Sequence, residues 1–99
     1  MSLYSVEFDP RALDEAGELS PRLRRRLKES LELLRAAPFR SHPGVLVKEI
    51  RELRGLWRFH LDRATRVFYT TTGDCLVVVL IERGAGVTRK TVRELHRRQ

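Results

Sequence analysis

The residues best suited to chemistry in this sequence are an arginine and a histidine separated by one residue, Arg58 and His60. They alternate with Trp57, Phe59 and Leu61 in the period-2 pattern of a half-buried strand, so both polar side chains are expected on one face. An arginine can bind phosphate through two hydrogen bonds, and a histidine titrates near neutral pH and can move a proton. The ordinary polar face of a half-exposed strand would have the same pattern.

The charge balance indicates a polyanionic partner. Twenty lysines and arginines stand against 13 acidic residues, which gives a formal net charge of +7 and a pI near 10.7. Such an excess on a small domain is typical of proteins that bind nucleic acid, an anionic membrane or an acidic protein segment. Arginine outnumbers lysine, which favours bidentate phosphate contacts. A solvated, arginine-rich surface is the alternative explanation.

Length and composition predict one globular domain over residues 1–99, with a single core and little room for a deep pocket. Hydrophobic residues make up 41% and charged residues 33%, which is typical of a folded chain. No apolar run approaches a membrane span, and the N-terminus lacks the pattern of a signal peptide. The single Cys75 excludes an internal disulfide. We therefore expect a cytoplasmic protein.

The first third of the chain predicts a strand followed by a helical hairpin. Residues 4–8 alternate between apolar and polar side chains, and Asp9-Pro10 and Ser20-Pro21 are typical helix starts. The hairpin is expected over residues 10–37. Its second helix places four leucines on one face, and these should pack on the sheet: Leu23, Leu27, Leu31 and Leu34.

The rest of the chain predicts mostly strands, at residues 57–61, 66–72 and 76–81, because β-branched and aromatic residues dominate there. Trp57, Phe59, Val67 and Tyr69 are expected to contribute to the core. A short C-terminal helix follows, for which Thr91 and Glu94 have the spacing of a capping box. The order β-α-α-β-β-β-α predicts an α+β fold, an antiparallel sheet of about four strands packed against the hairpin.

The order and spacing of several short motifs resemble the RelE/ParE superfamily of small basic toxins. Residues 4–13 are similar to the family's opening strand and helix start. Residues 52–61 (ELRGLWRFHL) resemble its strand of alternating aromatic, basic and apolar residues, and residues 66–69 (RVFY) match the strand that follows. Residues 88–91 (TRKT) resemble the basic tail of HigB-type members. The resemblance covers nearly the whole chain.

The resemblance implies a toxin of a type II toxin–antitoxin system, silenced by an antitoxin whose extended segment wraps the basic surface. RelE- and HigB-type members cut mRNA at the ribosome and so inhibit translation, whereas ParE-type members inhibit DNA gyrase. The ribosome-associated endoribonuclease branch (mRNA interferases) fits this chain better because of its arginine–histidine pair. Metal-free cleavage by a 2′-OH needs a base, an acid and cations that stabilise the phosphorane. No cofactor is therefore expected.

By position, the resemblance implies catalytic roles for Arg58, His60 and Arg66, with Arg83 as a further cation. Arg58, His60 and Arg66 should converge so that one phosphate reaches all three, and the antitoxin should cover them. Where the family has basic residues and a tyrosine near the C-terminus, residues 82–87 read ERGAGV. A gyrase inhibitor, or a member that binds RNA or antitoxin without cleavage, therefore remains an alternative.

Further basic residues are expected to bind RNA, namely Lys48, Arg51, Arg54, Arg89 and Lys90. The arginines of residues 22–35 form either a solvated helix face or a docking surface for ribosomal RNA. Trp57 is expected to pack in the core rather than to stack on a base. His42 and His96 have no partner at metal-ligand spacing, so no metal site is predicted.

Overall fold

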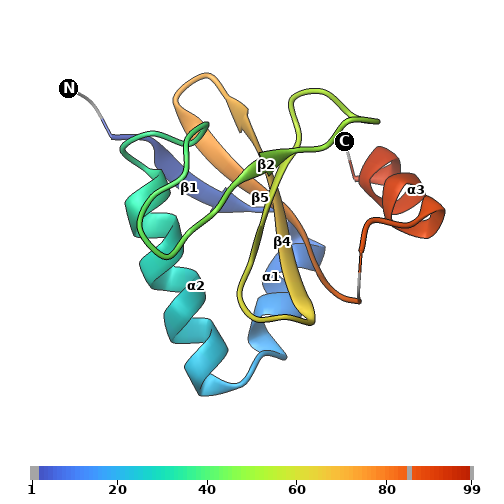
Figure 1. Ribbon diagram of the computed structural model, residues 1–99, viewed down its shortest axis with the longest axis horizontal. Helices are drawn as coiled ribbons and strands as arrows, with labels where there is room; N and C mark the ends of the chain where they lie inside the picture. Colours follow the sequence, from blue (N-terminus) through green and yellow to red (C-terminus); the bar gives the residue numbers. More distant parts are fainter. Residues whose placement is uncertain (1–2, 85, 99) are drawn as a thin grey trace.

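A five-stranded sheet separates two helices on one face from a third helix on the other. The computed structural model describes residues 3–84 and 86–98. Its elements are β1 (Ser5–Phe8), α1 (Pro10–Gly17), α2 (Pro21–Leu34), β2 (Lys48–Glu49), β3 (Trp57–His60), β4 (Thr65–Thr72), β5 (Cys75–Arg83) and α3 (Arg89–Arg97). The hairpin helix α2 and the C-terminal helix α3 lie on opposite sides of the sheet (Figure 1). The predicted α+β fold class is confirmed.

The sheet has the strand order β1-β5-β4-β3-β2. Its β2–β3, β3–β4 and β4–β5 pairs are antiparallel as predicted, but β1 pairs in parallel with β5. The sheet thus has five strands where about four were expected, and it is mixed rather than antiparallel, because of β1. β2 escaped prediction because its two residues are both exposed and leave no alternating pattern. The direction of β1 relative to β5 depends on how the chain between these two distant segments folds.

Side-chain caps start the first two helices where the sequence predicted. Asp9 Oδ1 accepts a hydrogen bond from Arg11 N at 2.9 Å, and Ser20 Oγ accepts one from Leu23 N at 3.2 Å. A proline follows each cap and costs nothing there, because its missing N–H would have no helical partner.

The expected capping box of α3 was wrong by one turn. Thr88 is the N-cap, and its Oγ1 accepts a hydrogen bond from Thr91 N at 3.2 Å. Thr91 lies inside the helix, where its side chain is buried and its hydroxyl donates to Glu82 Oε1 at 2.6 Å. Two threonines three residues apart offered two possible starts, and the sheet beneath the helix selects the first.

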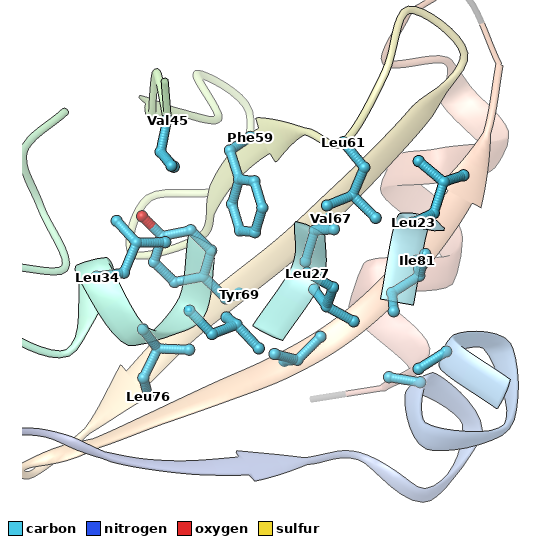
Figure 2. Close-up of a cluster of buried hydrophobic side chains, with 14 residues drawn as sticks. Leu23, Leu27, Leu34, Val45, Phe59, Leu61, Val67, Tyr69, Leu76 and Ile81 are labelled. Carbon is cyan, nitrogen blue, oxygen red and sulfur yellow. The ribbon is translucent and has the colours of Figure 1, made fainter. Parts of the chain in front are cut away.

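The hairpin packs on the sheet through the predicted leucines, which are all at most 5% exposed. They meet Phe59, Val67 and Tyr69 from the sheet, each fully buried (Figure 2). Trp57 packs half-buried at the edge of this core. The hydroxyl of Tyr69 donates to the carbonyl of Pro38 at 2.6 Å and anchors the chain after α2. Burial raises the pKa of Tyr69, so the phenol stays protonated.

A second apolar cluster lies under α3, where Leu95 contacts the side of the sheet that carries Phe68 and Leu80. The C-terminal end of α3 is tied to α1 by Arg98, whose guanidinium donates to both carboxylate oxygens of Glu15 at 2.9 and 3.0 Å. The same arginine also donates to the carbonyl of Val79 at 3.1 Å. Within the described part of the chain, no helix is long and apolar enough to cross a membrane.

Candidate functional site

Strand β3 carries Arg58 and His60 on the face opposite the hairpin, as the alternation predicted. Phe59, between them, is fully buried in the hairpin core, whereas Arg58 is half-buried and His60 is exposed. Arg58 Nη1 lies 3.5 Å from His60 Nδ1, at the outer limit of a hydrogen bond. The pair therefore forms a small polar unit that solvent and ligands can reach.

The environment of His60 favours its neutral form. Its pKa is lowered below the ordinary value of 6.5, chiefly because partial burial disfavours the charged imidazolium. Repulsion by Arg58 and Arg66 acts in the same direction, and Asp62 acts weakly against it. A neutral imidazole at physiological pH can accept a proton from a substrate hydroxyl.

Arg66 lies directly opposite His60 in the β3–β4 pairing, on the same face of the sheet. Arg66 is only 1% exposed, because α3 and Gly84 cover this part of the sheet. The backbone of Gly84 comes so close that a Cβ atom there would lie 3.0 Å from Arg66 Nη2. The structure thus brings Arg66 beside His60, but the expected open convergence of three side chains on one phosphate is not present.

The charge of Arg66 is balanced inside the protein. Arg66 Nη2 donates to Glu82 Oε1 at 2.7 Å, and the guanidinium lies 5.7 Å from the centre of the Phe68 ring. The same oxygen of Glu82 accepts the hydroxyl of Thr91 from α3. Arg66 Nε and Nη1 are buried with no hydrogen-bond partner among the described residues. Two donors of one buried arginine are therefore available for an anion only if the cover moves.

A basic groove continues from Arg58 toward α3. Three adjoining hollows of about 190, 360 and 460 Å³ share lining residues, among them the acidic Glu49 and Glu52. Glu49, Ile50 and Arg51 are common to the first two, and Glu52 and Val87 to the first and third. Lys48 is the cross-strand neighbour of Arg58 and lines the same hollow. The basic residues that line this groove are Lys48, Arg51, Arg54, Arg58, Arg89 and Arg93.

Four of the five predicted RNA-binding residues therefore gather in one groove. The exception is Lys90, which is exposed on α3 but does not line it. Arg93 lines the groove and was missed, because it becomes a neighbour of the β2–β3 connection only when α3 docks. Its place one helical turn after Arg89 was the signal that could have identified it.

Arg83 is not brought together with the other catalytic candidates. Alternation along β5 puts Glu82 on the face of His60 and turns Arg83 to the opposite side, where it lines a separate hollow with Glu15 and Glu18. Glu82 itself was missed by the sequence reasoning. No local pattern identifies it as a partner of Arg66, because the two residues meet only through the β4–β5 pairing.

The remaining candidates take structural positions. Trp57 packs on Phe39, with ring centres 5.5 Å apart. His42 Nε2 donates to the carbonyl of Ala37 at 3.0 Å and holds the loop after α2. Within residues 3–84 and 86–98, no three histidine, cysteine, aspartate or glutamate side chains gather as a metal-binding group.

The architecture is shared with solved toxin structures. A mutant of the E. coli toxin RelE in the free state superposes with a TM-score of 0.75 and 21% sequence identity, over 97% of each chain. The fold is that of the RelE toxins. The YoeB dimer from Staphylococcus aureus, with the same RelE-type fold, gives a TM-score of 0.72 at 11% identity, over 84% of this chain and 99% of the other.

A chain from the RelB–RelE antitoxin–toxin complex of Methanococcus jannaschii also has the RelE-type fold. It gives a TM-score of 0.65 at 14% identity, over 88% of this chain and 94% of the other. No protein-family model and no curated protein matches the sequence. The likeness thus concerns the fold, and the activity must be argued from this chain's own residues.

Proposed function

We propose that this chain is the toxin of a toxin–antitoxin pair and that it cleaves mRNA at the ribosome without a metal ion. The observation that carries the proposal is the position of His60 beside Arg58, a residue that lines the basic groove. A neutral histidine next to a fixed cation is suited to 2′-OH activation. The groove offers a path along which an RNA strand can approach the pair.

The proposed reaction needs one proton acceptor and one cation from the protein. His60 takes the proton of the 2′-OH, and the 2′-oxygen then attacks the neighbouring phosphorus. A bond forms between phosphorus and the 2′-oxygen, the bond to the 5′-oxygen breaks, and the departing oxygen takes a proton from water. Arg58 stabilises the negative charge on the phosphorane. The products are a 2′,3′-cyclic phosphate and a 5′-hydroxyl.

Arg66 would join this reaction only after a local rearrangement. Its Nε and Nη1 are buried without a partner among the described residues, and its Nη2 donates to Glu82, which also accepts the hydroxyl of Thr91 in α3. A phosphate that displaced this cover would gain a bidentate arginine next to His60. The protein would then cleave RNA more slowly while Arg66 is covered than after binding to its target has moved the cover.

A non-cleaving function is the second candidate, and the neutralised Arg66 favours it. The salt bridge with Glu82 removes one cation from the sheet face. The two tyrosines of the chain are Tyr4 and Tyr69, so residues 70–99 lack the tyrosine that the resemblance implies near the C-terminus. On this alternative, the chain acts by binding, as expected of a DNA gyrase inhibitor.

The proposed partner is an antitoxin encoded beside this chain that covers Arg58 and His60. Acidic residues on that partner would complement the net charge of +7. A neighbouring protein that leaves this face open would count against the assignment.

Induction of the chain in cells, followed by primer extension on a reporter mRNA, tests the proposal. Cuts within the translated region are expected, and Arg58→Ala should remove most of them. Arg40→Ala serves as the matched control, because Arg40 is exposed in the loop after α2, outside the groove and outside the arginines of residues 22–35. Supercoiling defects without RNA cuts would support gyrase inhibition and overturn the nuclease proposal.

A further inference from the structure

A cavity of about 570 Å³ lies where the turn between α1 and α2 faces the start of β4 and the end of β5. It is larger and more enclosed than each hollow of the basic groove, and it shares no lining residue with them. None of its described lining residues belongs to β1. Its volume is within the range of small-molecule sites. The cavity is therefore a candidate site of its own, apart from the groove proposed for RNA.

The sheet side of this cavity carries an arginine and a buried hydroxyl. Thr65 and Arg83 are direct cross-strand neighbours, and alternation puts both on the hairpin face, as it does Val67. Thr65 is fully buried, and its hydroxyl makes no hydrogen bond of ordinary geometry with another described residue. Arg83 is exposed and has no ion-pair partner in the described part of the chain. Two neighbouring donors without partners are suited to a carboxylate, which can accept from both.

The hairpin side of the cavity carries two carboxylates, of which one is already engaged. Glu15 Oε1 accepts a hydrogen bond from Ile81 N at 3.0 Å, and both oxygens of Glu15 bind the guanidinium of Arg98. Glu18 is exposed, and no ion pair joins it to any residue that the structure describes. Glu18 is also the C-cap of α1, and the C-terminal end of a helix favours a positive charge. The free charge on this side is thus negative and suited to an ammonium group.

Apolar side chains make up much of the remaining lining, namely Leu19, Leu23 and Ile81. Figure 2 shows Leu23 and Ile81 together at one end of the hairpin core. An aliphatic group that entered the cavity would gain free energy by contact with these side chains. The cavity thus combines a free cation, a free anion and an apolar wall, and the cation and the anion do not pair with each other.

We propose that this cavity binds a free α-amino acid with an aliphatic side chain. The carboxylate of the amino acid accepts hydrogen bonds from Arg83 and from the Thr65 hydroxyl. Its ammonium group pairs with Glu18, and its side chain packs on Leu19 and Leu23. A ligand with both charges pairs the two side chains that the protein leaves unpaired, which a simple anion or amine cannot do. This binding is independent of the proposed RNA cleavage.

Leucine is a suitable probe, added in steps to the whole protein and followed by amide NMR shifts. Saturable shifts are expected at residues 18–20 and 81–83. Isoamylamine lacks the carboxylate of leucine, and isocaproate lacks its ammonium group. Each should bind at least about tenfold more weakly than leucine, because each leaves one charge in the cavity unpaired. Shifts confined to other residues, the absence of saturable shifts, or equal affinity for leucine and either analogue would overturn the proposal.

Single charge removals test the orientation of the ligand. Arg83→Gln should weaken leucine binding at least about tenfold but leave isoamylamine binding unchanged, because this amine has no carboxylate. Glu18→Gln should weaken leucine binding to a similar extent and leave isocaproate binding unchanged. Arg63→Gln and Glu29→Gln make the same two charge changes at exposed positions outside the cavity, and they should alter leucine affinity by less than about twofold. Equal weakening by a variant and its control would mean that net charge alone attracts the ligand, and the proposed site would be wrong.

Asp62 competes with the ligand for the two groups on the sheet side. Attraction to the Thr65 hydroxyl is the chief cause that lowers the pKa of Asp62, and the charge of Arg83 acts in the same direction. Asp62→Asn should therefore tighten leucine binding by about twofold or more. The variant keeps the side-chain oxygen that accepts from Ala64 N at 2.9 Å. A loss of leucine binding would instead place the ammonium group at Asp62 and overturn its assignment to Glu18.

Thr65→Val removes the buried hydroxyl and keeps the shape of the side chain. Leucine affinity should fall at least about threefold, because the carboxylate loses a donor. Without leucine, the thermal midpoint should equal or exceed that of wild type, because the variant no longer buries a hydroxyl without a partner. Wild-type affinity for leucine, or a lower midpoint, would contradict the proposed role of Thr65. These assays contain no RNA, so their outcome is separate from that of the cleavage test.

Discussion

The two faces of the sheet bury different kinds of side chain. The hairpin face holds an apolar cluster in which the Tyr69 hydroxyl is satisfied by a main-chain carbonyl. The α3 face holds a smaller apolar cluster next to the buried Arg66. Two of the three guanidinium nitrogens of Arg66 lack partners among the described residues. Apolar burial stabilises a fold, whereas a buried guanidinium carries a desolvation penalty. Burial on the hairpin face thus stabilises the fold, whereas the buried charge on the α3 face carries a cost in folding free energy.

The α3 face is itself divided. The β4 and β5 half lies under α3, where the buried Arg66 pairs with Glu82, whose side chain is partly exposed. The β3 half is open, and His60 is exposed there. Because His60 and Arg66 are direct cross-strand neighbours, the boundary between covered and open regions passes through the candidate site. Measurements on the covered region and on the open region can therefore test whether the two differ as the structure indicates.

The largest expected effect concerns the open region. His60→Ala should lower the single-turnover rate of RNA cleavage by roughly 10²–10⁴-fold, the usual contribution of a general acid or base. His60→Gln should lose as much, because glutamine keeps a polar head but cannot titrate. Ribosome affinity should change far less in both variants. Full activity in both would leave His60 as an ordinary strand residue.

The pH dependence of the same reaction follows from the lowered pKa of His60. A base must be neutral to act, so the rate should be nearly constant at neutral pH and should fall as pH drops through a value below 6.5. A single-turnover pH profile measures this directly. An acid limb centred above 6.5 would mean that His60 is stabilised as the imidazolium in the complex.

Truncations of core side chains on the two faces should reduce the free energy of unfolding by different amounts. Leu34→Ala on the hairpin face should reduce the free energy of unfolding by about 2–5 kcal/mol, because Leu34 is fully buried. Leu95→Ala on α3 removes an equally buried side chain, but its cost cannot exceed the free energy that holds α3 in place. We expect a smaller global loss and faster amide exchange confined to α3. Equal losses in urea denaturation would show that α3 unfolds with the whole domain.

Salt dependence should separate the basic groove from the arginines of α2. If Arg51 contacts a phosphate, Arg51→Gln should reduce the slope of log affinity against log salt by roughly 0.7 for single-stranded RNA. Arg25→Gln on α2 should leave the slope unchanged. Filter binding over a series of salt concentrations provides the measurement. The reverse result would move the RNA path to the hairpin side.

The smallest effect is expected at the C-terminal end of α3. A hydrogen bond from Arg98 lowers the pKa of Glu94 below 4.5, with further attraction from the charges of Arg98, Arg97 and Arg11. A lowered pKa in the folded state adds stability that is present above the unfolded value and is lost as pH falls through the folded value. The protection factors of the α3 amides, which correct for the pH dependence of intrinsic exchange, should therefore fall below about pH 4.5 more in wild type than in Glu94→Gln.

Local patterns were sufficient for much of the fold. Leucines at helical spacing identified the buried face of α2, and the alternation around Phe59 placed Arg58 and His60 together on the other face. Both depend on a single element, whose period is set by its backbone geometry. The parallel direction of β1 and the short strand β2 depend on contacts between distant segments, and neither was predicted.

The sequence by itself determined which side chains share a face, because successive residues of a strand point to opposite sides whatever surrounds them. It did not determine which of them meet solvent. Arg66 lies on the predicted face, yet α3 and Gly84 cover it, and its charge is balanced by Glu82, a residue 16 positions away. Only tertiary structure decided this, because burial and pairing arise where elements distant in sequence dock together.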